Sequence, residues 1–164
     1  MKSSILLLAA ALSTTFCHAL EEKLHGVVKE VIDGNTITMV TMDKEEYKIV
    51  LHGIDSPEPG QDFAIQSKTF LQDLLLHKQI TAIIHGKDRL GNRLGEIRVE
   101  GAPDPRHELV RAGLAWTSEK ASNPELEILR EEARLNSLGI WKDENPTPPW
   151  VFRRQQSMMD SKSS

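Results

Sequence analysis

The sequence of 164 residues contains a single cysteine, Cys17, which lies near the N-terminus. One thiol cannot form a disulfide within the chain, so a disulfide-stapled scaffold is excluded. Stability must come from a packed apolar core, and roughly 120 ordered residues are enough to build one.

Long apolar runs are also missing. The stretch from Ile5 to Leu12 is too short to span a membrane, and no other long apolar stretch is present. It follows Lys2 and precedes Cys17-His18-Ala19, which places small residues at a cleavage site. This pattern predicts a signal peptide over residues 1–19, a secreted or periplasmic protein, and no membrane segment in the mature form. A lipoprotein cleavage site fits poorly, because Phe16 precedes the cysteine.

A surplus of positive charge is the third absence. The chain has 20 Lys and Arg against 24 Asp and Glu, a net charge of −4, and loss of Lys2 with the signal peptide makes it more acidic. Proteins that bind nucleic acid usually present excess Lys and Arg to the phosphates. The charge balance therefore counts against tight binding of nucleic acid.

What is present is a pattern of short strands interleaved with helices. Apolar residues alternate, or recur at helical spacing, in separate segments. The predicted strands cover residues 24–32, 36–41, 46–54, 79–85 and 93–99, and the predicted helices cover 62–77, 106–112 and 124–138. We predict an α+β, mainly β fold: a closed barrel with about three packed helices over residues 20–142. Residues 143–164 form a proline-rich and polar tail, predicted to be extended or disordered, and we assume a monomer.

Two polar turns stand at predicted strand ends. In Asp55-Ser56-Pro57-Glu58, the proline fixes the backbone and so holds the two carboxylates in a rigid turn. Asp55 offers the oxygen ligands that a hard cation prefers, and Glu58 can accept a proton from water. Asp33-Gly34-Asn35 is a second polar turn, between two strands. Together they predict a site, although the first turn alone is also compatible with an ordinary solvated turn.

Further motifs follow in a fixed order after these turns: Asp88-Arg89-Leu90-Gly91-Asn92, then His107 to Ala115, then Gly139-Ile140-Trp141. In order and spacing, the chain resembles the staphylococcal-nuclease-like family (thermonucleases) over about residues 24–142. The resemblance implies a five-stranded OB-type barrel and calcium-dependent cleavage of DNA and RNA.

The resemblance also implies roles for individual residues. Glu58 corresponds to the glutamate that activates water, Asp55 to a carboxylate that binds calcium, and Ser56 to a residue that offers its backbone carbonyl. Asp33 corresponds to a neighbour of the metal site. Asn35 stands where the family has a second calcium carboxylate, so one negative ligand is lost and calcium binding should be weak.

Two further positions depart from the family pattern. Val50 and Asn92 stand where the family has its two arginines, and neither side chain carries a charge that could offset a phosphate. Lys48, two residues before Val50 on the same strand face, and Arg93, next to Asn92, are the candidate catalytic replacements. Lysine lacks the fork with which arginine grips phosphate.

Two functions therefore stay open: a weakened calcium-assisted nuclease, and a non-catalytic barrel that binds nucleic acid or a protein partner. A metal cluster of His25, His52 and His85 is a further, weaker alternative, because their spacing matches no metal-binding motif. The aromatic and basic residues from Trp150 to Arg154 either contact nucleic acid or dock on the protein's own surface.

Overall fold

Five strands close into a barrel in the computed structural model, which describes residues 22–119 and 123–163. Their order around the barrel is β1-β2-β3-β6-β5, and neighbours run antiparallel except for the parallel pair β3 and β6. The strands are β1 (Glu22–Asp33), β2 (Thr36–Thr41), β3 (Glu46–Leu51), β5 (Gln79–Lys87) and β6 (Arg93–Arg98). The predicted OB-like barrel is confirmed. The predicted signal peptide lies outside the described residues.

Alternation along the strands builds the barrel interior. Ile37 and Met39 on β2, and Ile49 and Leu51 on β3, are fully or almost fully buried. The residue between the last two, Val50, is only half-buried and lies on the outer side of the barrel. The core also contains Val28, Val31, Leu71, Leu75, Ile97, Leu109, Val110 and Leu126.

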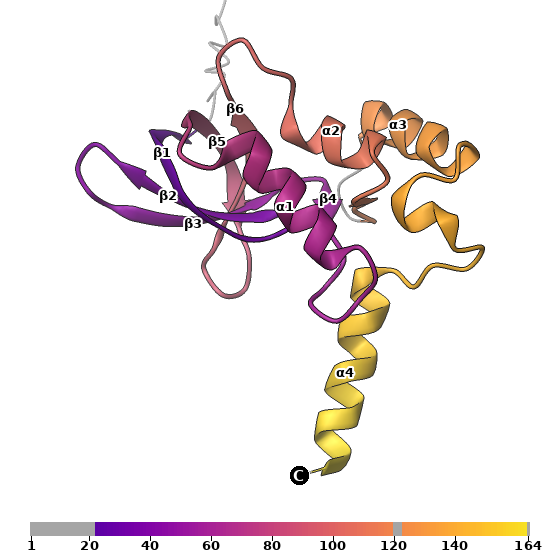
Figure 1. Ribbon diagram of the computed structural model, residues 1–164. Helices are drawn as coiled ribbons and strands as arrows, with labels where there is room; N and C mark the ends of the chain where they lie inside the picture. The colour runs from indigo at the N-terminus through magenta and orange to yellow at the C-terminus, as the bar shows by residue number, and fades with distance from the viewer. Residues whose placement is uncertain (1–21, 120–122, 164) are drawn as a thin grey trace, which may run out of the picture.

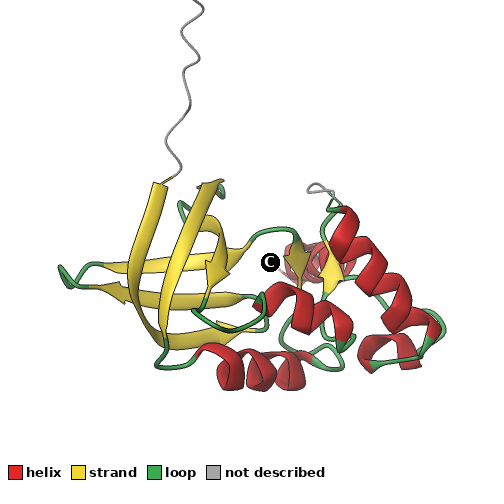
Figure 2. Ribbon diagram, turned by 90° about the horizontal axis from the view of Figure 1, so that it is seen from above, coloured by secondary structure: helices red, strands yellow, loops and turns green. Residues whose placement is uncertain are grey.

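The helices gather on one side of the barrel (Figure 2). They are α1 (Ala64–Leu75), α2 (Pro105–Arg111), α3 (Pro124–Leu135), the short 3₁₀ helix η1 (Gly139–Lys142) and α4 (Pro149–Ser163). α1 packs against β1, and α2 packs against α3. Asn123 caps α3 by accepting hydrogen bonds from the N–H groups of Glu125 and Leu126. α3 ends three residues before the predicted position 138, because Ser137 adopts a left-handed conformation with φ 50°.

A second, two-stranded sheet joins the barrel to the helical side. It pairs β4 (Ile54–Asp55) with β7 (Trp116–Thr117), and it sets Asp55 opposite Trp116. Trp116 in turn packs against Trp141 and Trp150, with ring centroids 4.6 and 5.7 Å apart. This sheet therefore links Asp55 to an aromatic cluster that includes the C-terminal segment.

The C-terminal segment is helical, which corrects the prediction of an extended or disordered tail. α4 begins at Pro149, and its first N–H donors, Val151 and Phe152, bond to the carbonyl of Pro148. Proline at the first helical position is favourable, and the Arg, Gln and Met residues that follow have good helix propensity. The prediction gave the polar composition too much weight. In Figure 1, α4 extends away from the barrel.

Among the residues that the structure describes, no helix combines the length and apolar character needed to cross a membrane.

Asp104 is predicted to be a major source of stability, because it neutralises a buried arginine. Its carboxylate accepts three hydrogen bonds from the Arg106 guanidinium and also caps α2 through the Arg106 N–H. The Arg106 side chain is only 5% exposed. We expect Asp104→Ala to lower the free energy of unfolding by about 3 kcal/mol in urea titration, because it leaves a buried charge with fewer partners.

Asn123→Ala is the matched control, since it removes a helix cap without affecting a buried charge. It should cost about 1 kcal/mol. Equal losses in the two variants would show that Arg106 does not depend on Asp104 for neutralisation.

Candidate active site

The two polar turns predicted from the sequence lie against each other. A Cβ atom added to Gly34 would lie 2.6 to 2.8 Å from side-chain atoms of Ser56 and Ser67, so only glycine fits between them. Ser56 is buried at 2% exposure, and its hydroxyl has no hydrogen-bond partner among the described residues. The Asp33 carboxylate accepts the N–H of Asn35 at 3.0 Å, which closes the first turn.

Asp55 and Glu58 are held by backbone interactions on either side of Pro57. Asp55 is part of β4, and its pairing with Trp116 fixes its backbone. The backbone N–H of Glu58 donates to the Gln61 side chain at 2.9 Å, and the N–H of Gln61 returns a bond to the Glu58 carbonyl at 2.9 Å. The side chains of Asp55 and Glu58 are 17% and 29% exposed, so both can meet a ligand.

Arg153 of α4 binds both carboxylates. Its Nη1 and Nη2 atoms lie 3.1 and 2.7 Å from the two oxygens of Asp55, which is a bidentate pair, and Nη1 also donates to Glu58. The hydrogen bond to Asp55, with a further one to Glu58, raises the pKa of the Arg153 guanidinium above its usual range, against the opposing effect of partial burial. One cation therefore offsets part of the charge of two adjacent anions.

The first turn of α4 is anchored beside this pair by other residues. Trp150 packs edge-on against Trp116, and Phe152 lies against Gly60 in a pocket that Pro57 and Phe63 also line. The Gln61 side chain donates to the Thr147 carbonyl at 2.8 Å. Trp150 and Phe152 of this segment thus dock on the protein's own surface, which is one of the two alternatives considered for it.

Comparison with known proteins identifies the family. The family model described as "Staphylococcal nuclease homologue" matches residues 48–143. A protein from Escherichia coli O157:H7 described as an uncharacterized endonuclease is 34% identical over 134 residues, which cover 81% of this chain and 87% of that protein. The chain belongs to the staphylococcal nuclease family.

Other relatives agree with this assignment. An uncharacterized endonuclease of Haemophilus influenzae is 32% identical over 157 residues, covering 95% of this chain and 85% of the relative. A protein of Shigella flexneri described as a micrococcal nuclease is 30% identical over 140 residues, covering 79% and 80% of the two chains. In each of these comparisons, the alignment covers most of this chain and most of the relative.

For a staphylococcal nuclease homologue, the placement of the two predicted cations is informative. Arg93 stacks on the Tyr47 ring, 4.2 Å from its centroid, and its Nε lies 3.4 Å from a Glu22 oxygen. Asn92 donates to the Asp88 carboxylate at 2.7 Å within its own turn, and Lys48 is exposed on β3. The cation on Asp55 and Glu58 is instead Arg153, which is 95 residues from Glu58 in the sequence. The Trp150 to Arg154 motif was the one sequence signal for it.

Two of the three histidines considered as a metal cluster do come together. The rings of His52 and His85 are 4.9 Å apart, and Glu96 completes a group whose ligand atoms lie within 4.8 Å of one another. Glu96 already accepts bonds from His85 and from buried Arg106. Burial, followed by the charges of His85 and Arg106, lowers the pKa of His52. Within this group, Glu96 is the residue that pairs with the buried Arg106.

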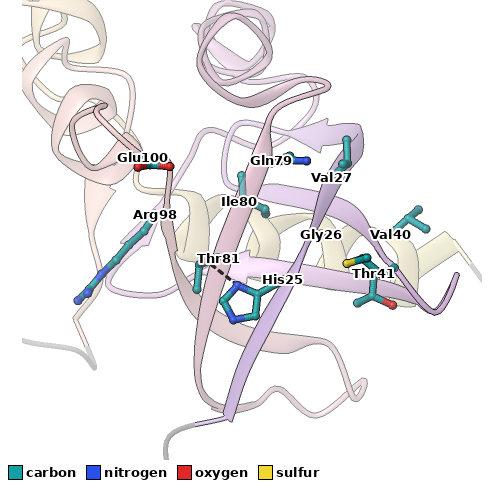
Figure 3. A pocket seen from close by; sticks show the side chains of 11 residues that line it. His25, Gly26, Val27, Val40, Thr41, Gln79, Ile80, Thr81, Arg98 and Glu100 are labelled. Carbon is teal, nitrogen blue, oxygen red and sulfur yellow. Dashed lines mark hydrogen bonds between the residues drawn. The ribbon is translucent and has the colours of Figure 1, made fainter.

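The third histidine lies elsewhere on the barrel. His25 bonds to the Thr81 hydroxyl at 3.0 Å, in a pocket of about 330 Å³ between β1, β2, β5 and β6 (Figure 3). Arg98 and Glu100 also line this pocket, but none of the residues predicted for the calcium site or for catalysis does. It is therefore separate from the carboxylate pair.

Proposed function

We propose that the protein is an exported, calcium-assisted endonuclease that hydrolyses phosphodiester bonds of DNA or RNA, with a lower rate than a family member that keeps both arginines. The observation that carries the proposal is the carboxylate pair of Asp55 and Glu58. It lies in a fixed turn packed against Gly34, in a chain whose relatives are described as endonucleases.

The donor atoms at this site suit a hard cation such as calcium. Asp55 would be the anionic ligand, Asn35 an amide ligand and Ser56 a carbonyl ligand, with Asp33 next to them; all of these are oxygen donors. The unpartnered hydroxyl of Ser56 adds a polar atom that a ligand shell could satisfy. When bound, calcium would act as a Lewis acid on a phosphate oxygen. Neutral Asn35 and the competing charge of Arg153 should keep the affinity low.

Glu58 is the residue that we propose to take a proton from the attacking water. Its carboxylate is partly exposed, and its backbone is fixed by two hydrogen bonds with Gln61. Positioned carboxylates act in this way in many hydrolases. Lys48 and Arg93 stay proposed sources of positive charge for the phosphate, although Arg93 would first have to leave Tyr47 and Glu22.

A non-catalytic barrel that binds nucleic acid or a protein partner is the second candidate. Val50 and Asn92 favour it, because neither can stabilise the charge of a phosphorane-like transition state. The acidic net charge of −4 fits a protein partner better than nucleic acid.

Calcium titration by calorimetry, combined with cleavage of single-stranded DNA, tests the proposed nuclease. We expect one weak calcium site that Asp55→Asn removes, and cleavage that a calcium chelator stops. Asp43→Asn, in the exposed turn between β2 and β3, is the control and should leave both unchanged. Calcium binding without any cleavage would favour the binding module, and absence of both would refute the nuclease.

Export is proposed from the N-terminal pattern alone. Sequencing of the mature protein from an exporting host should give an N-terminus near Leu20.

A further inference from the structure

Arg153 approaches the carboxylate pair from outside the barrel. The residues that anchor α4 are Trp150 and Phe152, together with the bond from Gln61 to Thr147. These contacts do not involve the Arg153 guanidinium. The backbone of Arg153 is therefore held beside Asp55 and Glu58 whether or not its own ion pairs are made.

The Arg153 guanidinium, which here binds two carboxylates, is equally suited to bind a phosphate. Its fork of N–H donors matches the oxygens of carboxylate and phosphate equally well. Its side chain is 48% exposed and faces solvent beside the pair. A divalent cation on Asp55 would repel the guanidinium, and the nearest new partner would be the phosphate that the cation attracts.

We propose that Arg153 is a catalytic residue that contacts the phosphate of a bound nucleic acid and offsets its charge. It would do so from α4, in place of arginines at positions 50 and 92. The inference rests on the proposed nuclease function, since it names the residue that supplies positive charge at that site. In the absence of substrate, the same side chain pairs with Asp55 and Glu58.

The competing interpretation is that Arg153 blocks the site. Both interpretations predict that loss of the arginine tightens calcium binding, because a competing cation is removed from Asp55. The two interpretations predict opposite effects on the binding and cleavage of nucleic acid. A phosphate ligand is lost in the first case, so binding and cleavage of nucleic acid fall, whereas a block is removed in the second, so both rise.

The experiment compares the wild type with Arg153→Ala and Arg153→Lys, and uses Arg154→Ala as the matched control. Arg154 is the next residue of α4 and is exposed. Three quantities are measured: calcium affinity by calorimetry, affinity at saturating calcium for a four-nucleotide single-stranded DNA with hydrolysis-resistant phosphorothioate linkages, and cleavage rate on ordinary single-stranded DNA.

We expect Arg153→Ala to lower kcat about 100-fold, the usual effect of removing one transition-state donor, and to weaken oligonucleotide binding about tenfold. Calcium affinity should rise, because a competing cation is removed from Asp55. Arg153→Lys should recover only part of the loss, since lysine cannot bind phosphate in a bidentate way. Arg154→Ala should stay within about twofold of the wild type. If limited proteolysis shows that Arg153→Ala loosens α4, Arg153→Met, which keeps the aliphatic stem, replaces it.

Faster cleavage or tighter oligonucleotide binding by Arg153→Ala would overturn the proposal in favour of a block. Unchanged values, or equal losses in Arg154→Ala, would overturn it as well. If the wild type cleaves nothing but Arg153→Ala still weakens oligonucleotide binding, the nuclease function fails while Arg153 is confirmed as a phosphate ligand. The two claims are thus separated.

Discussion

Replacement of Glu58 by glutamine is expected to lower calcium-dependent cleavage about 1,000-fold while the protein stays folded. A positioned general base typically contributes two to four decades in rate, and glutamine cannot accept a proton at neutral pH. The exchange keeps the side-chain shape and leaves the backbone bond from Glu58 to Gln61 in place. The measurement is the initial rate on single-stranded DNA, with circular dichroism as the check on folding.

Glu45→Gln is the control for this variant, because it removes the same charge from the exposed turn before β3. It should cleave like the wild type. Cleavage by Glu58→Gln at the wild-type rate would mean that another group activates water, or that the activity belongs to a contaminant.

The second large effect is an expected increase in the cleavage rate. The variant that combines Val50→Arg, Asn92→Arg and Asn35→Asp should cleave about 1,000-fold faster than the wild type. Each preorganised donor is worth about two to three decades, but contributions within one site are not additive. Val50 lies on the outer side of β3, opposite Thr36, which follows Asn35. The backbone of an arginine at position 50 would therefore lie next to the turn Asp33-Gly34-Asn35.

A control variant with Met42→Arg and Ile128→Arg adds the same two positive charges at exposed positions elsewhere. It separates a local effect from general attraction of nucleic acid, which acts over a longer range and weakens with salt. If the triple variant gained no activity over this control, the pocket would differ from the family site at more than these three positions.

The barrel could be predicted from the sequence because its determinants are local. Alternation places Ile37, Met39, Ile49 and Leu51 inside, and Asp33 closes the first hairpin. The helical spacing of apolar residues predicted the first three helices to within a few residues. The polar turns are likewise local, and the fold brings them together as expected.

The cation at the site could not be predicted in this way. Lys48 was suggested because it shares a strand face with Val50, and Arg93 because it is next to Asn92 in the sequence. An arginine, however, pairs with whichever partners its long side chain can reach, and Arg93 reaches Tyr47 and Glu22. Arg153 arrives from the opposite end of the chain. Its position depends on aromatic contacts between Trp116 and Trp150, which no local pattern encodes.

The aromatic cluster next to Asp55 has an optical consequence. The chain has three tryptophans, and Trp116 packs against the other two, Trp141 and Trp150. Because Trp116 is also paired with Asp55 across the small sheet, part of the tryptophan emission of the protein originates next to Asp55. Ligand arrival, or departure of the C-terminal helix, can thus be followed as a spectral change in the unlabelled molecule.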